Sequence, residues 1–169
     1  IKQMGYMVES SIEQCFIAFE DKDFEKAEGI IRGDRTINDL ERSIEARCLS
    51  LILRQQPVAG DLRVVSSALK VVTDLERIGD HASDIAELIL RIRGEHIYHV
   101  VRHVPGMAMA AREMVRSAID AFISQDITAA KTIEKQDDIV DELFTKVKND
   151  VIELLKQSAE PADQCIDLL

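Results

Sequence analysis

Acidic residues recur at one-turn intervals between Asp74 and Glu87, and this spacing constrains the chain more than any other feature of its sequence. At about 100° per residue, Glu76, Asp80 and Asp84 fall within ~80° of one another on a helix. Four apolar residues expected to pack against neighbouring helices lie in or beside that sector: Leu62, Val65, Leu69 and Val72. Like charges one turn apart cost about 0.2–0.5 kcal/mol per pair, and a partly buried carboxylate costs more unless it is paired or binds a metal. The sequence therefore predicts a cation at this face.

The composition favours an all-α fold with a substantial core. Of the 169 residues 46% are hydrophobic, which supplies a core, whereas 7 Gly and 3 Pro leave few residues for the turns of an all-β fold. The net charge of −10 excludes general nucleic-acid binding, because phosphates would be repelled.

The longest uncharged apolar runs are far below the ~20 residues of a membrane span and no signal peptide is visible, so the cytoplasm is the expected location. Cys15, Cys48 and Cys165 are widely spaced and predict buried, reduced thiols.

The sequence repeats itself at an offset of 103 residues, which predicts a duplicated helical unit. The offset relates Phe19 to Phe122, Asp23 to Asp126 and Asp34 to Asp137. Helical periodicity and the Pro and Gly positions predict two tandem three-helix bundles: residues 1–94, a linker or start of the next helix at 95–106, and residues 107–169. The counterpart of Glu76 would fall at position 179, beyond Leu169, and the chain starts inside an amphipathic pattern at Ile1. We therefore expect the second bundle to be incomplete and the chain to be part of a longer protein.

A second acidic stripe lies on the second predicted helix of each copy. Asp34, Asn38, Glu41 and Glu45 fall within ~60° of one another, and the counterparts of the first two are Asp137 and Asp141. Oxygen ligands at i and i+4 on two adjacent helices can surround one or several hard cations. The alternative is a solvated acidic face that Arg77 and Arg47 partly neutralise.

Three segments resemble the PhoU family of bacterial phosphate-specific transport. They are Met4-Gly5, the segment from Gln55 to Arg63 that reads QQPVAGDLR, and the segment from Asp74 to His81 that reads DLERIGDH. The resemblance covers essentially the whole chain. It implies two three-helix bundles, no enzymatic activity, and a multinuclear metal cluster of iron or zinc, with manganese or nickel as alternatives.

The family pattern, carried onto this sequence, implies seven metal ligands: Asp34, Asn38, Glu76, Asp80 and Asp84 in the first bundle, and Asp137 and Asp141 in the second. Asn38 departs from the pattern, because an amide oxygen is a weaker ligand than a carboxylate. The resemblance further implies a homodimeric cytoplasmic regulator that contacts the phosphate transporter ATPase and a sensor histidine kinase, represses the phosphate-starvation response, and meets the membrane only through protein partners.

Other constellations give weaker signals. His96, His99 and His103 would form a metal-binding face if helical, but a solvated linker is the commoner outcome between Gly94 and Pro105. No His has Glu three residues before it, which argues against di-iron oxidase chemistry, and no phosphate loop or nucleophile motif is present. A helical scaffold or dimerisation module without metal or signalling role remains the alternative function.

Overall fold

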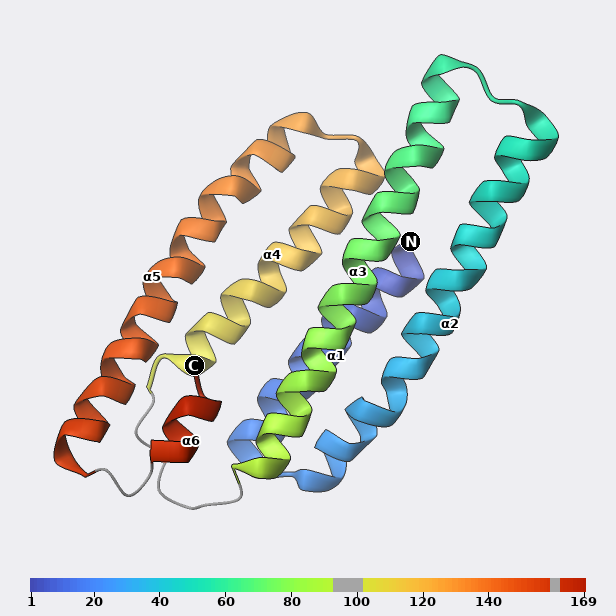
Figure 1. Cartoon of the computed structure of the whole chain (residues 1–169). Helices are drawn as coiled ribbons and strands as arrows, with labels where there is room; N and C mark the ends of the chain where they lie inside the picture. The colour runs from blue at the N-terminus through green and yellow to red at the C-terminus, as the bar shows by residue number, and fades with distance from the viewer. Residues whose placement is uncertain (93–101, 159–161) are drawn as a thin grey trace.

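The computed structural model describes residues 1–92, 102–158 and 162–169, and every regular element in these ranges is an α-helix, as predicted (Figure 1). The helices are α1 (Lys2–Asp21), α2 (Phe24–Gln55), α3 (Ala59–Arg91), α4 (Val104–Ser124), α5 (Ile127–Gln157) and α6 (Ala162–Asp167). Positions 95–101 of the predicted linker lie outside the described ranges, so the domain limits stay a prediction. No helix in the described part of the chain has both the length and the apolar character needed to cross a bilayer.

The duplication is visible in the local structure of two turns. α1 ends at Lys22 with φ 55°, and α4 ends at its counterpart Gln125, also with φ 55°. The next residue then caps a helix: Asp23 accepts a hydrogen bond from Lys26 N, and Asp126 accepts from Thr128 N and Ala129 N. A left-handed residue followed by an Asp N-cap ends one helix and starts the next without losing backbone hydrogen bonds. The repeated sequence thus encodes a repeated turn.

Helices α1, α2 and α3 pack together around two apolar clusters. The first cluster joins Cys15, Ala18 and Phe19 of α1 to Ala27 of α2 and to three residues of α3, namely Ala82, Ala86 and Ile89. Small side chains at the centre of this cluster allow the helix axes to approach closely. The second cluster contains Met4, Val8, Ile37, Val72 and Leu75, and it also takes in Ile119 of α4. The core of the first unit therefore continues into the second.

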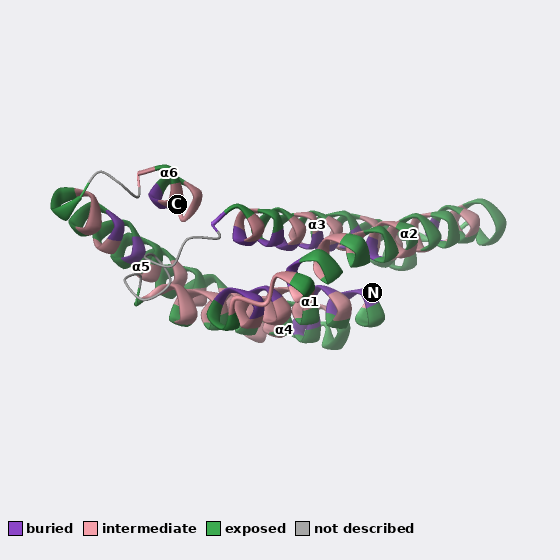
Figure 2. Ribbon diagram, turned by 90° about the horizontal axis from the view of Figure 1, so that it is seen from below, coloured by how far each residue is buried: buried purple, intermediate pink, exposed green. Residues whose placement is uncertain are grey.

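Helices α1 and α4 lie side by side and antiparallel in the lower layer of Figure 2. Arg112 donates to Glu9 at 3.3 Å and to Glu13 at 2.8 Å, and Arg116 lies 3.8 Å from Glu9. Arg112 and Arg116 are the repeat counterparts of Glu9 and Glu13, so the two units meet about a pseudo-twofold axis with opposite charges at equivalent positions. Gly5 lets Ile119 approach, because a Cβ there would lie 2.5 Å from Ile119 Cδ1.

The equivalent apolar positions of the second unit line an open groove. Ala118, Ala121, Phe122 and Ala130 are the counterparts of the first cluster's Cys15, Ala18, Phe19 and Ala27, and they border a groove of about 930 Å³. In the first unit α3 covers these positions. At the other end of α5, Val147 and Val151 pack against Cys165 of α6.

One part of the predicted core face is wrong. Val72 is buried and Val65 and Leu69 are half-buried, but Leu62 is 42% exposed. The reason is length: at 1.5 Å per residue, α1 with 20 residues is about 18 Å shorter than α2 with 32. The α2–α3 hairpin therefore extends past the N-terminus of α1, as Figure 1 shows, and Leu62 lies on the extension.

The charge pairs between the units predict that reversing the charge of Arg112 destabilises the protein more than reversing the charge of an exposed arginine. Arg112→Glu would place three carboxylates together and leave Glu9, only 12% exposed, without its partner. We expect the free energy of unfolding to fall by about 1–3 kcal/mol in a urea titration. Arg32→Glu, at the exposed pair with Glu28, should cost less than ~1 kcal/mol.

A full charge exchange tests whether the interaction is electrostatic. The variant Glu9→Arg, Glu13→Arg, Arg112→Glu, Arg116→Glu should recover most of the lost stability, because opposite charges again face each other. If the fourfold variant is as unstable as Arg112→Glu alone, the loss comes from packing and the electrostatic account is wrong.

Candidate metal centre

The close packing of α2 on α3 brings the two predicted acidic stripes together. A Cβ on Gly79 would lie 3.1 Å from Ile37 Cδ1 and 3.2 Å from its Cγ2, so the missing side chain lets buried Ile37 sit directly on α3. Asn38 follows Ile37, and Asp80 follows Gly79. Residues one turn away on each helix, Asp34 and Glu76, therefore border the same seam. All four side chains are half-buried.

Two oxygen atoms at this seam lack a hydrogen-bond partner. Asn38 Nδ2 donates to Asp34 Oδ2 at 3.0 Å. The second carboxylate oxygen of Asp34, Oδ1, and the amide oxygen of Asn38, Oδ1, are buried and accept no hydrogen bond from the described residues. An unsatisfied buried acceptor costs about 1–3 kcal/mol, and more when it carries charge. A cation between the helices would satisfy both atoms.

The electrostatics of the seam also favour a positive ligand. Burial raises the pKa of the Asp34 carboxyl, the Asp80 and Asp84 carboxylates raise it further, and the Asn38 hydrogen bond lowers it. Burial likewise raises the pKa of Glu76, with further contributions from Asp80, Glu41 and Asp34, whereas Arg77 lowers it. These acids of α2 and α3 thus interact with one another, and the excess of negative charge is only weakly offset.

The remaining predicted ligands lie in more open positions. The Asp84 side chain is 72% exposed and its Oδ2 lies 3.7 Å from His81 Nδ1. Asp137 and Asp141 are exposed on α5, whose main packing partners among the described helices are α4 and α6. Sequence reasoning missed Gln136, whose Oε1 is buried without a partner. Its repeat counterpart is Gly33, so the duplication gave no signal for it.

The side chains as they stand do not form a finished cluster site. Within the described ranges no group of three His, Cys, Asp or Glu side chains is arranged to hold a metal ion. The fit to a cation rests on the oxygen-only donor set of Asp34, Asn38, Glu76 and Asp80 and on the two unsatisfied oxygens. These four residues suit a hard cation, and the exposed acids on α5 show no comparable arrangement.

The histidine alternative finds no support in the described residues. His96 and His99 lie outside the described ranges. His103 Nδ1 lies 2.7 Å from Asp150 Oδ2, which ties the start of α4 to α5. The three cysteines are buried and free, as predicted. Cys15 Sγ donates to Ala82 O at 3.0 Å, and burial raises its pKa to about 12, which makes it an unreactive core thiol.

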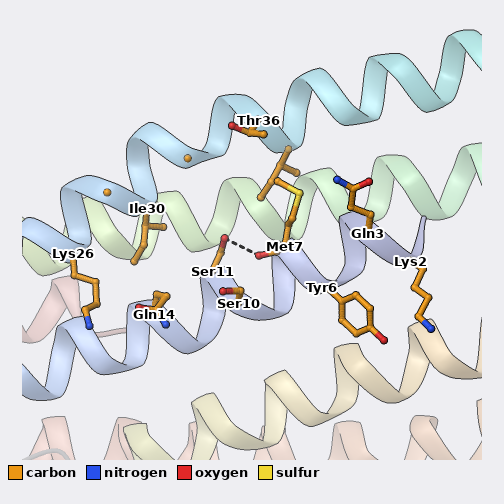
Figure 3. Close-up of a pocket in the computed structure, with 13 residues that line it drawn as sticks. Lys2, Gln3, Tyr6, Met7, Ser10, Ser11, Gln14, Lys26, Ile30 and Thr36 are labelled. Atoms are coloured by element: carbon orange, nitrogen blue, oxygen red, sulfur yellow. Dashed lines mark hydrogen bonds between the residues drawn. The ribbon is translucent and has the colours of Figure 1, made fainter.

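A groove of about 900 Å³ lies between α1 and α2, away from the acids (Figure 3). Lys26 and Lys2 stand at its two ends, and Lys2 Nζ lies 5.6 Å from the centre of the Tyr6 ring. Met7, Ile30 and Ile37 are among the residues that line it, and Gly29 and Gly33 leave open space beside α2. No acid, histidine or cysteine lines it, so it carries no metal-binding set.

Comparison with known proteins decides the family. A family model described as the PhoU domain matches residues 1–89 and 104–169. The chain belongs to the PhoU family. The PhoU homolog of Clostridium acetobutylicum, a phosphate-specific transport system accessory protein, is 36% identical over 168 residues, covering 99% of this chain and 77% of the relative. The homolog of Aquifex aeolicus is 37% identical over 150 residues, covering 89% and 68%.

Solved structures of PhoU proteins share the fold. PhoU from Pseudomonas aeruginosa superposes with a TM-score of 0.89 at 30% identity, covering 98% of this chain and 80% of that one. The phosphate transport system regulatory protein PhoU from Streptococcus pneumoniae gives a TM-score of 0.88 at 27% identity, covering 98% and 77%. These matches confirm the helical-bundle fold and the predicted family. The relatives are accessory proteins, and this PhoU-family chain is likewise not an enzyme.

The raised pKa of Asp34 predicts the sign of a pH effect in metal-free protein. The unfolded carboxyl, with its ordinary pKa of 3.8, loses its proton before the folded one does. Between the two pKa values the folded state binds more protons, so the free energy of unfolding should fall as the pH rises through this window. Urea titrations with chelator at several pH values above 4 measure this slope.

Two variants test whether Asp34 causes this pH dependence of the free energy of unfolding. Asp34→Asn should reduce the slope, because one of the two carboxyls with a raised pKa is gone and Glu76 remains. Asp74→Asn, an exposed acid outside the seam, should leave the slope unchanged. An unaltered slope in Asp34→Asn would show that this carboxyl is not under electrostatic stress.

Proposed function

We propose that this chain is a cytoplasmic regulator of phosphate uptake and of the phosphate-starvation response. It acts as an adaptor between the phosphate transporter ATPase and a sensor histidine kinase, and it holds the response off when phosphate is plentiful. The names of its relatives, which are phosphate-specific transport system accessory proteins, support the transport role. Likeness to the family supports the kinase contact, the negative sign of regulation and a homodimer.

We further propose that metal binding at the α2–α3 seam is part of this function. The observation that carries the proposal is the pair of buried, unsatisfied oxygens of Asp34 and Asn38 among mutually repelling carboxylates. Glu76 and Asp80 complete the main ligand set, with Asp84 at its edge and Asp137 and Asp141 as the second unit's ligands. The group is a multinuclear cluster of iron or zinc, with manganese or nickel as alternatives. When bound, it would supply the positive charge that the seam lacks and link α2 to α3.

The shape and charge of the chain suit an adaptor. Long helices present rigid faces, and the net charge of −10 would steer the protein toward basic surfaces of a transporter subunit or kinase. The relatives are named as accessory proteins, so binding rather than turnover is the expected mode of action. A helical scaffold with neither metal nor signalling role is the competing function.

Metal titration of paired variants tests the seam. Protein prepared without chelator should contain metal, and an excess of the same metal should raise the free energy of unfolding by about 3 kcal/mol, as expected for a ligand at 100 times its Kd. Asp80→Asn should reduce the gain below ~1 kcal/mol with helicity unchanged, because it removes a ligand and not a core residue. Asp74→Asn, six residues earlier on the same helix and 55% exposed, is the matched control.

Elemental analysis decides between the two functions. Absence of bound iron, zinc, manganese and nickel, with no stabilisation by added metal, would remove the cluster and leave the scaffold. Equal metal occupancy in Asp80→Asn and in the unmodified chain would place the metal elsewhere.

Affinity capture tests the adaptor role. The tagged chain, expressed in phosphate-replete cells, should recover the transporter ATPase or the sensor kinase, and starvation should reduce that recovery. Arg112→Glu, which is expected to lower the stability of the protein, serves as a control that shows how far reduced stability alone lowers the recovery. Recovery of neither protein under either condition would contradict the adaptor function.

A further inference from the structure

The end of the α2–α3 hairpin exposes more large apolar side chains than a solvated turn needs. We define the α2–α3 tip as residues 47–64. Its exposed apolar residues are Leu49 (53%), Leu51 (41%), Leu53 (78%), Val58 (76%), Leu62 (42%) and Val64 (50%). The tip extends past the N-terminus of α1, and Figure 2 shows exposed residues at the far end of α2. Only Arg63 and Val64 of the tip border a groove with another helix, the one that α4 and α5 also line. An exposed apolar patch of this kind commonly marks an interaction site.

These side chains point in several directions around the tip. Leu51 and Leu53 are ~200° apart on α2, and both are exposed. Leu49, Leu51, Leu53 and Val58 line none of the grooves described above. One flat protein face would cover only one side of such a tip. A surrounding medium covers all sides at once.

The tip also reverses the sign of the chain's charge. The tip contains three basic residues, Arg47, Arg54 and Arg63, and one acid, Asp61, which gives a local charge of +2 in a chain of −10. Arg47, Arg54 and Arg63 are exposed and form no ion pair within the described ranges. Lower on the same helix, Arg32 pairs with Glu28 and Arg42 with Asp39. The arginines at the tip are therefore available to an external anion.

The acidic body does not cancel this local charge. Glu45, the acid of α2 nearest to Arg54, precedes it by nine residues, about 14 Å along the helix. Charges are largely screened beyond about 8 Å at physiological ionic strength. An anionic surface that approaches the tip therefore meets mainly its arginines.

We propose that the α2–α3 tip binds directly to an anionic lipid surface. Leu53 and Val58 enter the layer between headgroups and acyl chains, which accepts apolar side chains to a depth of about 5–10 Å, and Arg47, Arg54 and Arg63 contact lipid phosphates around them. The contact is peripheral. It departs from the expectation that the chain meets a membrane only through protein partners, and it is independent of the metal and adaptor roles proposed above.

Vesicle binding of the whole chain tests the proposal. Vesicles of phosphatidylglycerol and phosphatidylcholine should carry the protein down in a sedimentation assay, and vesicles of phosphatidylcholine alone should bind much less. Leu53→Ser with Val58→Ser should reduce binding to the anionic vesicles about tenfold. Arg54→Gln with Arg63→Gln should reduce it about 25-fold, at about fivefold per arginine, and added salt should also weaken binding.

Matched variants on the body serve as controls. Ile139→Ser removes an apolar side chain that is 53% exposed on α5 and should leave vesicle binding unchanged. Arg35→Gln with Lys131→Gln removes two exposed, unpaired charges away from the tip and should also leave it unchanged. Metal content and urea stability of the tip variants should equal those of the unmodified chain, which separates a failure here from a failure of the metal site.

Four results would overturn the proposal. The first is no binding to anionic vesicles, and the second is equal binding to neutral and anionic vesicles. The third is an equal loss of vesicle binding in the tip and body variants. The fourth is capture of a purified transporter ATPase that depends on the tip residues while vesicles do not bind, which would assign the tip to a protein surface.

Discussion

The contact between Gly79 and Ile37 determines the properties of the candidate site. Because residue 79 has no side chain, Ile37 packs directly on α3, and the polar residues beside the contact are held within the seam. Asp34, Asn38, Glu76 and Asp80 flank that contact on the two helices, and all four side chains are half-buried. Apolar packing thus offsets the cost of burying like charges, and the raised pKa values of Asp34 and Glu76 reflect that cost. A cation is the ligand that relieves it.

The duplicated sequence yields two units that are related but not interchangeable. The turns at Lys22 and Gln125 are the same, which shows how strongly local sequence determines local structure. The surfaces between the units differ in charge, because Glu9 and Glu13 face Arg112 and Arg116. If two first units paired through this surface, acids would face acids, and if two second units did so, arginines would face arginines. The charges therefore favour pairing of a first unit with a second unit. Phe19 is buried under α3, whereas its counterpart Phe122 borders a groove.

Helices and acidic stripes were predictable from the sequence because both follow local periodicity. The acidic stripe of Asp34, Asn38, Glu41 and Glu45 was placed on a helix and lies within α2 (Phe24–Gln55), and the stripe of Glu76, Asp80 and Asp84 lies within α3 (Ala59–Arg91). The helical projection of the sequence also placed Asp34 and Asn38 on the same face. It did not show that Asp34 is half-buried while Asp84 is exposed, since that depends on which helix packs on each face. The exposure of Leu62 depends on the lengths of neighbouring helices, and the contacts of Arg112 depend on how the two units meet. Periodicity contains none of that information.

Anomalous X-ray diffraction from crystals of the whole chain, grown without chelator and measured on both sides of the absorption edge of the metal found by elemental analysis, tests the central claim most directly. The account predicts an anomalous peak between α2 and α3, within bonding distance of Asp34, Asn38 and Asp80 oxygens. Carboxylates that turn to bulk solvent, with no anomalous density at the seam in crystals soaked with iron or zinc, would contradict it.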